Sequence, residues 1–404
     1  MSCVGRAAGA ARRRRVETNT VDSSAAGTVL VSTRSLALAA QPAGSDGDRV
    51  GYLARVTIQT PNDDVRRAAA ERLGALATPP GALGRLGELA VWVAACQGEV
   101  PPRPVENVRL VIFAGDHGVA QHGVSAFPPA ITGAMVRTFL GGRAGVSALA
   151  KAHGVQVRVL DLGVDEEFED LDATTREALT QHKIRRGSGA IHLEDALSAE
   201  ETRAALEAGA AVAREEIAAG AQLLISGDMG IGNTTPAAAM VAAGLGLPAS
   251  EVTGRGTGIG DDALRTKTDV ITAALDRAGE RAGDPVETLA ALGSADLAAT
   301  TGYLLEAARS GTPVLLDGLM SVACALTADR IEPGAATWYA AGHRSTEPAQ
   351  SMALEKLGLE PLLDLDLRLG EGSGAVAAVP VVRSAVALLR DVALLSELAP
   401  GDPA

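Results

Sequence analysis

From about residue 102 onward, short apolar runs alternate with longer segments whose apolar residues recur at helical spacing. This alternation is typical of α/β folds, in which each helix carries the chain back to begin the next parallel strand. We therefore expect a mostly parallel sheet flanked by helices, with strands at 108–114, 156–162, 222–226, 313–317, 335–341 and 363–368. The expected helices of this region are 129–151, 198–219, 234–245, 261–280, 284–309, 319–328, 347–357 and 375–397.

The chain before this region divides into two parts. Between residues 63 and 97, apolar residues recur every three or four positions, and Pro79-Pro80-Gly81 separates two expected helices. Residues 1–60 instead begin with a basic block, Arg12–Arg15, and continue in Ser, Thr, Ala and Gly with little periodicity. We expect residues 1–60 to be a disordered and dispensable tail.

The loops that follow the expected strands are polar and rich in glycine. Ligands of parallel α/β sheets bind outside the carboxyl ends of the strands, so these loops are expected to form one site. The last loop places a single carboxylate, Glu371, between Gly370 and Gly372 at the point where a strand becomes a helix. Because small residues surround it, we expect Glu371 to meet a bound ligand. The six loops begin at Gly115, Asp161, Gly227, Asp317, Gly342 and Gly370.

Charge and cysteine content limit the partners of the chain. The formal net charge is −13, so we expect no nucleic-acid partner and no anionic membrane surface. An anionic substrate would need local donors, such as backbone amides, a few arginines or a lysine. No apolar run approaches 18 uncharged residues, which predicts no membrane-spanning segment. The three cysteines show no Cys-x-x-Cys spacing, which argues against a disulfide framework and indicates a cytoplasmic protein.

The glycine motifs do not match those of nucleotide cofactor sites. Gly256-Thr257-Gly258 has Ile259 where a dinucleotide-binding motif needs its last glycine, and no strand directly precedes it. Gly230-Ile231-Gly232 fails in the same way, because Thr235 occupies that position. The chain also contains neither a P-loop motif nor a Gly-x-Ser-x-Gly nucleophile elbow. We therefore expect no bound cofactor.

Two other classes of function remain open at this point. Asp116 and His117 resemble a fragment of a dinuclear phosphoesterase, and Asp228 could join them as a metal ligand. Such a site needs further His and Asn ligands, and the six histidines of the chain show no ligand-like spacing, so we expect no metal. A metal-dependent phosphoesterase using Asp116, His117 and Asp228 is the alternative enzyme. A non-catalytic nucleotide sensor would use the same loops for binding alone.

Five motifs, taken in order, resemble one enzyme family, the nicotinate-nucleotide–dimethylbenzimidazole phosphoribosyltransferases of cobalamin nucleotide-loop assembly. Each motif is weak alone, but the ordered set is specific, and the resemblance covers about residues 62 to 398. The motifs are Phe113-Ala114-Gly115-Asp116-His117-Gly118, Gly123-Val124-Ser125-Ala126-Phe127-Pro128, Asp228-Met229-Gly230-Ile231-Gly232-Asn233-Thr234-Thr235, Gly256-Thr257-Gly258 and Arg368–Gly374.

The resemblance implies a fold, an assembly and a reaction. It implies a homodimer, a Rossmann-like large α/β domain at 101–374, and a small helical domain built from both chain ends, 61–100 plus 375–404. The implied reaction converts nicotinate mononucleotide and 5,6-dimethylbenzimidazole into α-ribazole 5′-phosphate and nicotinate. The glutamate of the family's Gly-Glu-Gly loop, which acts as catalytic base, corresponds to Glu371. The family often has glutamate where this chain has Asp228, so the reach of that side chain is shorter here.

This chemistry assigns expected roles to the remaining loop residues. Asp228 is the candidate second carboxylate near an oxocarbenium-like ribosyl centre. We expect the 5′-phosphate to be bound by the donors of Gly230, Gly232, Asn233, Thr234, Ser345, Gly370 and Gly372. Lys267 is expected to bind the phosphate or the carboxylate of the substrate, and Arg368 could bind the same anion. The flat, apolar acceptor base is expected in a slot formed by Ser125, Phe127, Met229, Leu319 and Met320. The range of acceptor bases is not fixed by these motifs.

Overall fold

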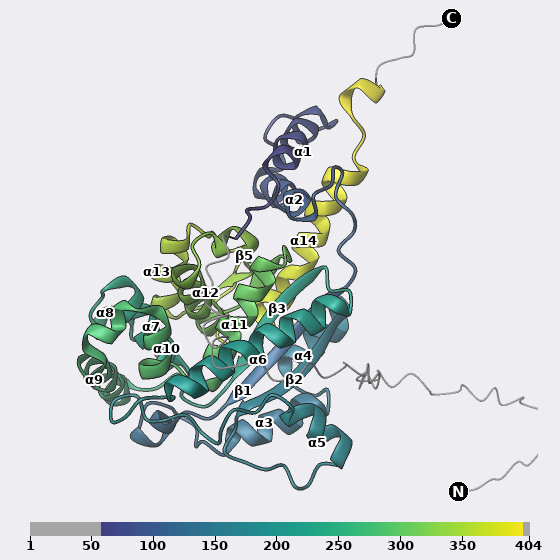
Figure 1. Cartoon of the computed structure of the whole chain (residues 1–404). Helices are drawn as coiled ribbons and strands as arrows, with labels where there is room; N and C mark the ends of the chain where they lie inside the picture. The colour runs from purple at the N-terminus through teal and green to yellow at the C-terminus, as the bar shows by residue number, and fades with distance from the viewer. Residues whose placement is uncertain (1–57, 399–404) are drawn as a thin grey trace, which may run out of the picture. The chain divides into compact units, whose positions relative to one another are not determined.

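A computed structural model describes residues 58–398, so the expected tail lies almost wholly outside the described residues. The main sheet has five strands, all parallel, in the order β2-β1-β3-β4-β5 (Figure 1). Their bounds are β1 (Val108–Gly115), β2 (Val155–Gly163), β3 (Leu223–Met229), β4 (Val314–Leu316) and β5 (Tyr339–Ala341). The order places β1 and β3 in the centre, so their carboxyl ends lie at the middle of the site edge.

The helices flank both faces of this sheet, and the alternation of side chains along β1 shows how. Val111 and Phe113 pack into one apolar cluster with α6, α7, α11 and α12, whereas Leu110 and Ile112 pack into a second cluster with α2, α3, α4 and α14. Successive strand residues point to opposite faces, so a strand buried on both faces is apolar throughout. The helices are α1 (Asp63–Ala75), α2 (Gly84–Gln97), α3 (Ile131–Leu140), α4 (Gly145–His153), α5 (Ala173–Thr180), α6 (Ala199–Ala218), α7 (Thr234–Leu245), α8 (Ala249–Val252), α9 (Asp261–Ala278), α10 (Pro285–Leu292), α11 (Ala295–Arg309), α12 (Leu319–Ile331), α13 (Pro348–Leu357) and α14 (Ser373–Asp391).

The predicted α/β fold class is confirmed, but the sixth expected strand is wrong. Only β7 (Leu363–Asp364) forms there, and it pairs with β6 (His343–Arg344) in a separate two-stranded sheet. Within the expected strand, Leu363 and Leu367 are half-buried, whereas Leu365 is exposed. The chain beyond β7 is therefore a loop that leads to Glu371.

Several other element boundaries differ from those that the apolar periodicity predicts. The expected helix 129–151 is two helices, α3 and α4, interrupted at Gly141–Gly142. The expected helix 284–309 is also two, α10 and α11, because Ser294 caps the second one with its hydroxyl 3.4 Å from the N–H of Leu297. Residues 335–338 form a 3₁₀ turn rather than part of a strand, and the short helices α5 and α8 were not expected.

Helices α6 and α11 approach each other through glycine. A Cβ on Gly302 would overlap the carbonyl oxygen of Leu206, and one on Gly209 would overlap that of Ala299. Backbone atoms cannot withdraw as a flexible side chain can. The close approach fixes α11, whose first turn reaches the site edge.

We expect Gly302→Ala to lower the free energy of unfolding by about 1–3 kcal/mol, because overpacking forces the two helices apart. Gly74→Ala is the matched control, since Gly74 also lies in a helix but has open space around it. That control should leave stability unchanged or raise it by up to about 1 kcal/mol through helix propensity. Denaturant unfolding of both variants measures the difference, and equal destabilisation would contradict the close-packing argument.

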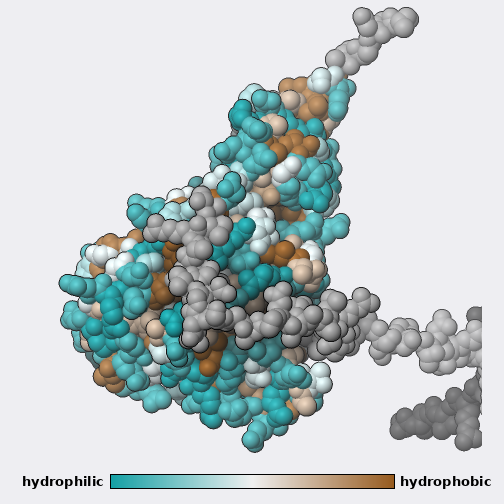
Figure 2. All heavy atoms as spheres, viewed as in Figure 1, coloured by the Kyte–Doolittle hydropathy of each residue, from teal (hydrophilic) through white to brown (hydrophobic). Residues whose placement is uncertain are grey.

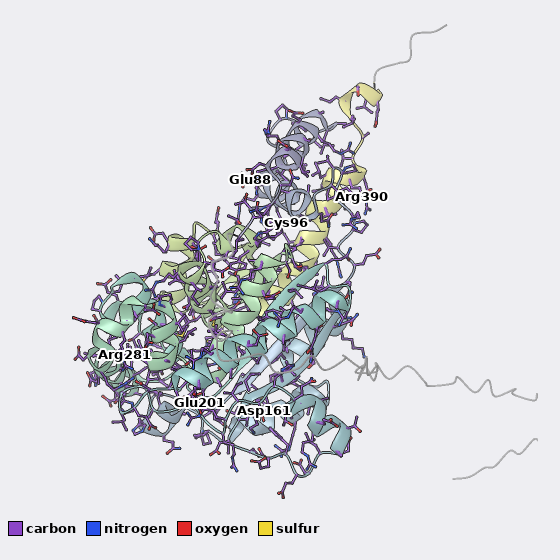
Figure 3. All side chains as sticks on the ribbon, in the orientation of Figure 1. Glu88, Cys96, Asp161, Glu201, Arg281 and Arg390 are labelled. Atoms are coloured by element: carbon purple, nitrogen blue, oxygen red, sulfur yellow. The ribbon has the colours of Figure 1, made fainter. Side chains whose placement is uncertain are left out.

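The helices at the two ends of the described chain lie together. Both α1 and α2 pack on α14 (Figures 1 and 3), and the side chain of Arg72 donates to the carbonyl of Leu389 at 2.8 Å. The described cysteines, Cys96 on α2 and Cys324 on α12, are free thiols, and Cys3 lies outside the described residues. The division into a small helical domain and a large domain stays a prediction.

Helix α14 is the one described segment long and apolar enough to cross a membrane. The sequence showed no uncharged run of this length, because Arg383 interrupts it. In the structure 56% of the most apolar stretch is buried inside the protein, and Arg383 donates to the carbonyl of Val105 at 2.9 Å. These are features of a core helix. The face shown in Figure 2 is mostly hydrophilic, with small hydrophobic groups, one of them near α1 and the end of α14.

Candidate active site

Glu371 lies at the carboxyl edge of the sheet in an unusual backbone conformation. Its φ is 66°, between Gly370 at 77° and Gly372 at 90°, and such values disfavour residues other than glycine. The side chain is 6% exposed, and Oε2 accepts a hydrogen bond of 3.2 Å from the N–H of Val146 at the start of α4. Burial raises the pKa of Glu371; the Val146 N–H opposes this and the negative charge of Asp317 adds to it.

Two neighbours hold the Glu371 loop in place. Gly227 on β3 lies so close that a Cβ there would overlap the carbonyl oxygen of Glu371. Asp317, directly after β4, accepts hydrogen bonds from the N–H groups of Gly372 at 3.1 Å and Ala375 at 3.0 Å. The loop therefore rests on the ends of two strands, and the N–H of Gly372 is already bonded to Asp317.

Asp228 and Asp296 form a buried carboxylate pair at the end of β3. Asp228 accepts from the side-chain amide of Asn233 at 2.6 Å, and its second oxygen has no partner among the described residues. Burial raises the pKa of Asp228 well above its ordinary value, and the charge of Asp296 raises it further. Asp296, in the first turn of α11, is fully buried, with one oxygen 3.5 Å from Nε2 of His117.

Lys267 lies on α9, and its buried ammonium group reaches the first residue of α7. Its ammonium group donates to the hydroxyl of Thr234 at 2.8 Å and to the carbonyl of Gly254 at 3.0 Å. The side chain is fully buried, and burial lowers its pKa while the nearby Glu347 carboxylate opposes this shift. Glu347 in turn accepts from the N–H of Gly256 at 2.7 Å. The Gly254–Gly258 loop is thus held between a lysine and a glutamate.

The remaining phosphate candidates lie around the same loop. The guanidinium of Arg368 lies beside Gly258, so the Gly254–Gly258 loop and the loop before Glu371 meet there. The hydroxyl of Ser345 accepts from the N–H of Glu347 at 3.4 Å. Gly230 packs tightly against His117 and the carbonyl of Gly115, and Gly232 lies beside Ala120. The structure therefore brings the loops together but leaves the role of each donor a prediction.

The residues expected to form the acceptor slot differ in burial. Met229, at the end of β3, and Met320, beside Gly370 of the Glu371 loop, are both buried, and so is Leu319, the first residue of α12. Phe127, by contrast, is 51% exposed. Its loop reaches the Gly254–Gly258 loop through the N–H of Ala126, which donates to the hydroxyl of Thr257 at 3.1 Å.

A narrow cavity connects the two carboxylate regions. Its lining includes Asp228, Thr300, Asp317 and Met320, together with small residues of β3 and α12. The hydroxyl of Thr300 is buried and has no hydrogen-bond partner among the described residues. Polar groups therefore line this cavity, but it is too narrow in this structure to hold a water molecule.

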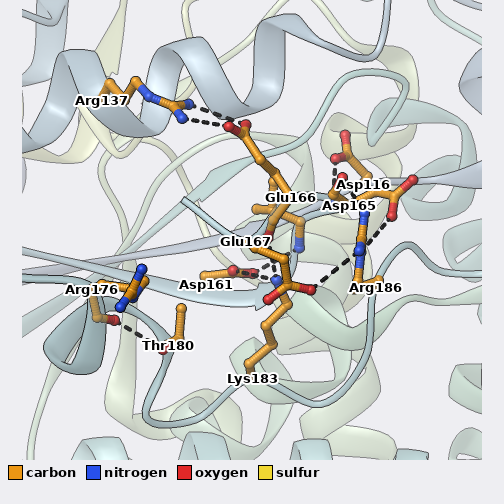
Figure 4. Close-up of polar contacts among 11 residues, drawn as sticks. Asp116, Arg137, Asp161, Asp165, Glu166, Glu167, Arg176, Thr180, Lys183 and Arg186 are labelled. Atoms are coloured by element: carbon orange, nitrogen blue, oxygen red, sulfur yellow. Dashed lines mark hydrogen bonds and ion pairs between the residues drawn. The ribbon is translucent and has the colours of Figure 1, made fainter. Parts of the chain in front are cut away.

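The geometry does not favour the metal-dependent alternative. Asp116 accepts from the N–H of Asp165 at 2.9 Å, and Asp165 pairs with Arg186 (Figure 4), whereas His117 faces Asp296. Within residues 58–398, no three His, Cys, Asp or Glu side chains are grouped as metal ligands. Asp116, His117 and Asp228 therefore do not form the three-ligand group that a dinuclear phosphoesterase would start from.

Sequence reasoning missed two residues of the site, Asp296 and Glu347. Asp296 follows Gly293-Ser294, a helix-start signal, and Glu347 precedes Pro348 at the start of α13. Gly293-Ser294 lay inside the expected helix 284–309, whereas Glu347 was expected only as the start of the helix 347–357. A helix-start signal after a buried glycine could have placed Asp296 at the site edge, but nothing local predicts its approach to Asp228.

Comparison with known proteins places this fold and site in a class of transferases. A family model described as phosphoribosyltransferase matches residues 58–398. A crystal structure of CobT from Thermus thermophilus is similar with a TM-score of 0.78 and 44% identity, covering 83% of this chain and 98% of that one. The chain is thus a phosphoribosyltransferase by fold and family.

The particular family follows from curated relatives. A nicotinate-nucleotide–dimethylbenzimidazole phosphoribosyltransferase of Mycolicibacterium paratuberculosis is 51% identical over 347 residues, which cover 86% of this chain and 98% of that protein. The Mycobacterium tuberculosis protein of the same name is 49% identical over 340 residues, 84% of this chain and 92% of that protein. This chain belongs to the nicotinate-nucleotide–dimethylbenzimidazole phosphoribosyltransferase family. It is a pentosyltransferase of cobalamin synthesis, and the resemblance predicted from the motifs is confirmed.

Proposed function

We propose that the protein transfers the phosphoribosyl group of nicotinate mononucleotide to 5,6-dimethylbenzimidazole, with Glu371 as general base. The products are α-ribazole 5′-phosphate and nicotinate. The observation that carries this proposal is a buried carboxylate of raised pKa, held on a positive-φ loop at the strand ends. We further propose a cytoplasmic homodimer that needs no cofactor or metal.

The reaction needs a single base. The free ring nitrogen of the benzimidazole attacks C1′ of the ribose, and the bond from C1′ to the nicotinate nitrogen breaks. The electron pair of that bond returns to the pyridine ring, so nicotinate leaves without a general acid. The attacking ring becomes an imidazolium, and its N–H proton passes to Glu371. A positioned base of this kind contributes roughly 10²- to 10⁴-fold.

The geometry of attack sets the stereochemistry. Attack on the face opposite the departing ring converts the β-nucleotide into an α-riboside. The acceptor ring must then lie between Glu371 and the ribose, where Met229 and Met320 provide apolar surface. The exposed Phe127 would cover the outer side of the ring.

Asp228 would act as half of a pair. Burial raises the pKa of Asp228 well above its ordinary value, and the negative charge of Asp296 raises it further. The oxygen of Asp228 that has no hydrogen-bond partner among the described residues would face the ribosyl centre, where it would stabilise developing positive charge during transfer. In this proposal Asp228 stabilises the ribosyl centre, and Glu371 takes the proton.

The direct test is a product assay with the purified protein. Nicotinate mononucleotide and 5,6-dimethylbenzimidazole should give equimolar nicotinate and a riboside phosphate, whose α configuration proton NMR would establish. Exhaustive chelation should not lower the rate, whereas a metal-dependent phosphoesterase would lose activity and release inorganic phosphate. Competition among benzimidazole, adenine and phenolic acceptors would define the acceptor range, because such contacts differ by about 1–3 kcal/mol. Absence of nicotinate release in the presence of the base would refute the proposal.

A further inference from the structure

Asp317 and His343 form a buried charged pair behind the Glu371 loop. Nε2 of His343 lies 3.4 Å from Oδ1 of Asp317, and both side chains are nearly inaccessible to solvent. Burial alone would raise the pKa of Asp317, but His343 and the amides of Ala375 and Gly372 outweigh it, so the pKa lies below its ordinary value. Burial alone would lower the pKa of His343, but Asp317 raises it above its ordinary value. The two shifts favour the ionised form of Asp317 and the protonated form of His343.

The backbone around the pair is fixed from a second side. The side-chain amide of Gln350 is fully buried and donates to the carbonyl oxygens of Asp317 at 3.1 Å and His343 at 2.9 Å. Its oxygen accepts from the N–H of Ser345 at 2.6 Å. One side chain of α13 thus joins the end of β4 to β6, so the separation of Asp317 and His343 is set by the fold.

The first turn of α14 rests directly on this pair. A Cβ on Gly374 would overlap the imidazole of His343, so only glycine lets the helix start come this close. Asp317 accepts the Gly372 and Ala375 N–H groups of the same turn. Unpaired N–H groups and the partial positive charge of a helix start favour an anion there. The position of Glu371, one residue before Gly372, depends on these contacts.

We propose that the Asp317–His343 pair is a positioning device for the catalytic base, which holds the Gly370–Ala375 turn so that the Glu371 carboxylate faces the acceptor nitrogen. Neither residue needs to touch a substrate for this role. His343 keeps Asp317 ionised, and ionised Asp317 keeps the turn in place. The inference rests on the proposed role of Glu371 as the base.

The same arrangement makes Glu371 a stronger base. Asp317 is the charged side chain that acts on Glu371, and it adds to the effect of burial. On the other side, α4 offers the backbone N–H of Val146. The guanidinium of Arg368, on the same loop as Glu371, lies beside Gly258. Removing the charge of Asp317 should therefore shift the acid limb of the pH profile to lower pH.

The test compares His343→Gln and Asp317→Asn with wild type. We expect both variants to lose about 10²-fold in kcat, because a displacement of about 1 Å at the reacting atoms costs that much. The KM for nicotinate mononucleotide should change less than about threefold in both. The acid limb of kcat/KM should also move to lower pH in Asp317→Asn. His182→Gln is the matched control, since His182 also pairs with a carboxylate, Glu215 at 3.4 Å, but in a different part of the fold.

The outcomes separate this inference from the proposed function. If wild type makes the α-riboside but both variants match it in kcat, or lose only thermal stability, the positioning role is wrong. The same holds if His182→Gln loses as much kcat as His343→Gln. If wild type itself makes no α-riboside, the proposed function fails first. Should Asp317→Asn not fold, His343→Gln alone decides, because it keeps the Asp317 side chain and removes only the imidazole beside it.

Discussion

Replacing Glu371 with glutamine should lower kcat for phosphoribosyl transfer by about 10²- to 10⁴-fold, with little change in nucleotide affinity. Glutamine keeps the size of the side chain and an oxygen that can accept from the N–H of Val146, but it cannot take a proton. The acceptor ring would then retain its N–H while positive charge grows on it. Steady-state rates and isothermal titration with nicotinate mononucleotide measure the two quantities separately.

Glycine at position 371 provides an unusual control for folding. Glu371 has a φ of 66°, and such a conformation costs a residue with a side chain about 1–3 kcal/mol. Glu371→Gly should therefore be as stable as wild type or more stable, yet as inactive as the glutamine variant. A variant that is both stable and inactive cannot be explained by unfolding.

A second control uses a glutamate away from the site. Glu355, on the exposed surface of α13, should tolerate Glu355→Gln without loss of rate.

The pH profile provides the last check. As the pH is lowered, wild-type kcat/KM should fall because Glu371 becomes protonated. Because burial raises the pKa of Glu371, this fall should occur at a pH above the ordinary glutamate range. Near wild-type turnover in Glu371→Gln would remove the base assignment.

The apolar pattern predicted the layers of the fold better than the ends of its elements. The residues Val108–Gly115 are apolar at nearly every position, which only a strand covered on both faces requires, and the structure buries them on both faces. The segment from Leu363 to Leu367 alternates leucine with aspartate, which also predicts a strand, yet it forms only two residues of strand. Its pairing depends on β6, a contact that no local pattern encodes.

The site was predictable where glycines and strand ends coincide. Glu371 stood out because three glycines surround it, and the strained backbone of the structure explains why they are needed. Asp296 and Glu347 could not be found in this way, since each acts through a partner distant in sequence. Asp296 interacts with Asp228, which lies 68 residues earlier in the sequence. Only the packing of α11 on the sheet brings the two carboxylates together.

Replacing Lys267 with methionine should raise the KM for nicotinate mononucleotide by about 10- to 150-fold, the range that hydrogen bonds to charged groups of about 1.5–3 kcal/mol imply. Among the described residues, Thr234 and Gly254 receive two hydrogen bonds from the ammonium group. An ammonium has three N–H donors, so one is left for a phosphate oxygen. Burial lowers the pKa of Lys267, and a bound phosphate dianion would favour its charged form.

The matched control is Lys183→Met. Lys183 is also largely buried and binds a carboxylate, with its ammonium 2.8 Å from Asp161 and 2.7 Å from the carbonyl of Glu166 (Figure 4). Its loss should lower stability but leave the KM unchanged, so a general effect of removing a buried lysine can be separated from a loss of phosphate binding. Lys267→Met should also bind free nicotinate as wild type does, because that product lacks the phosphate. Equal loss of affinity for nicotinate and its mononucleotide would assign Lys267 to the ring carboxylate, and unchanged affinity for both would remove it from the site.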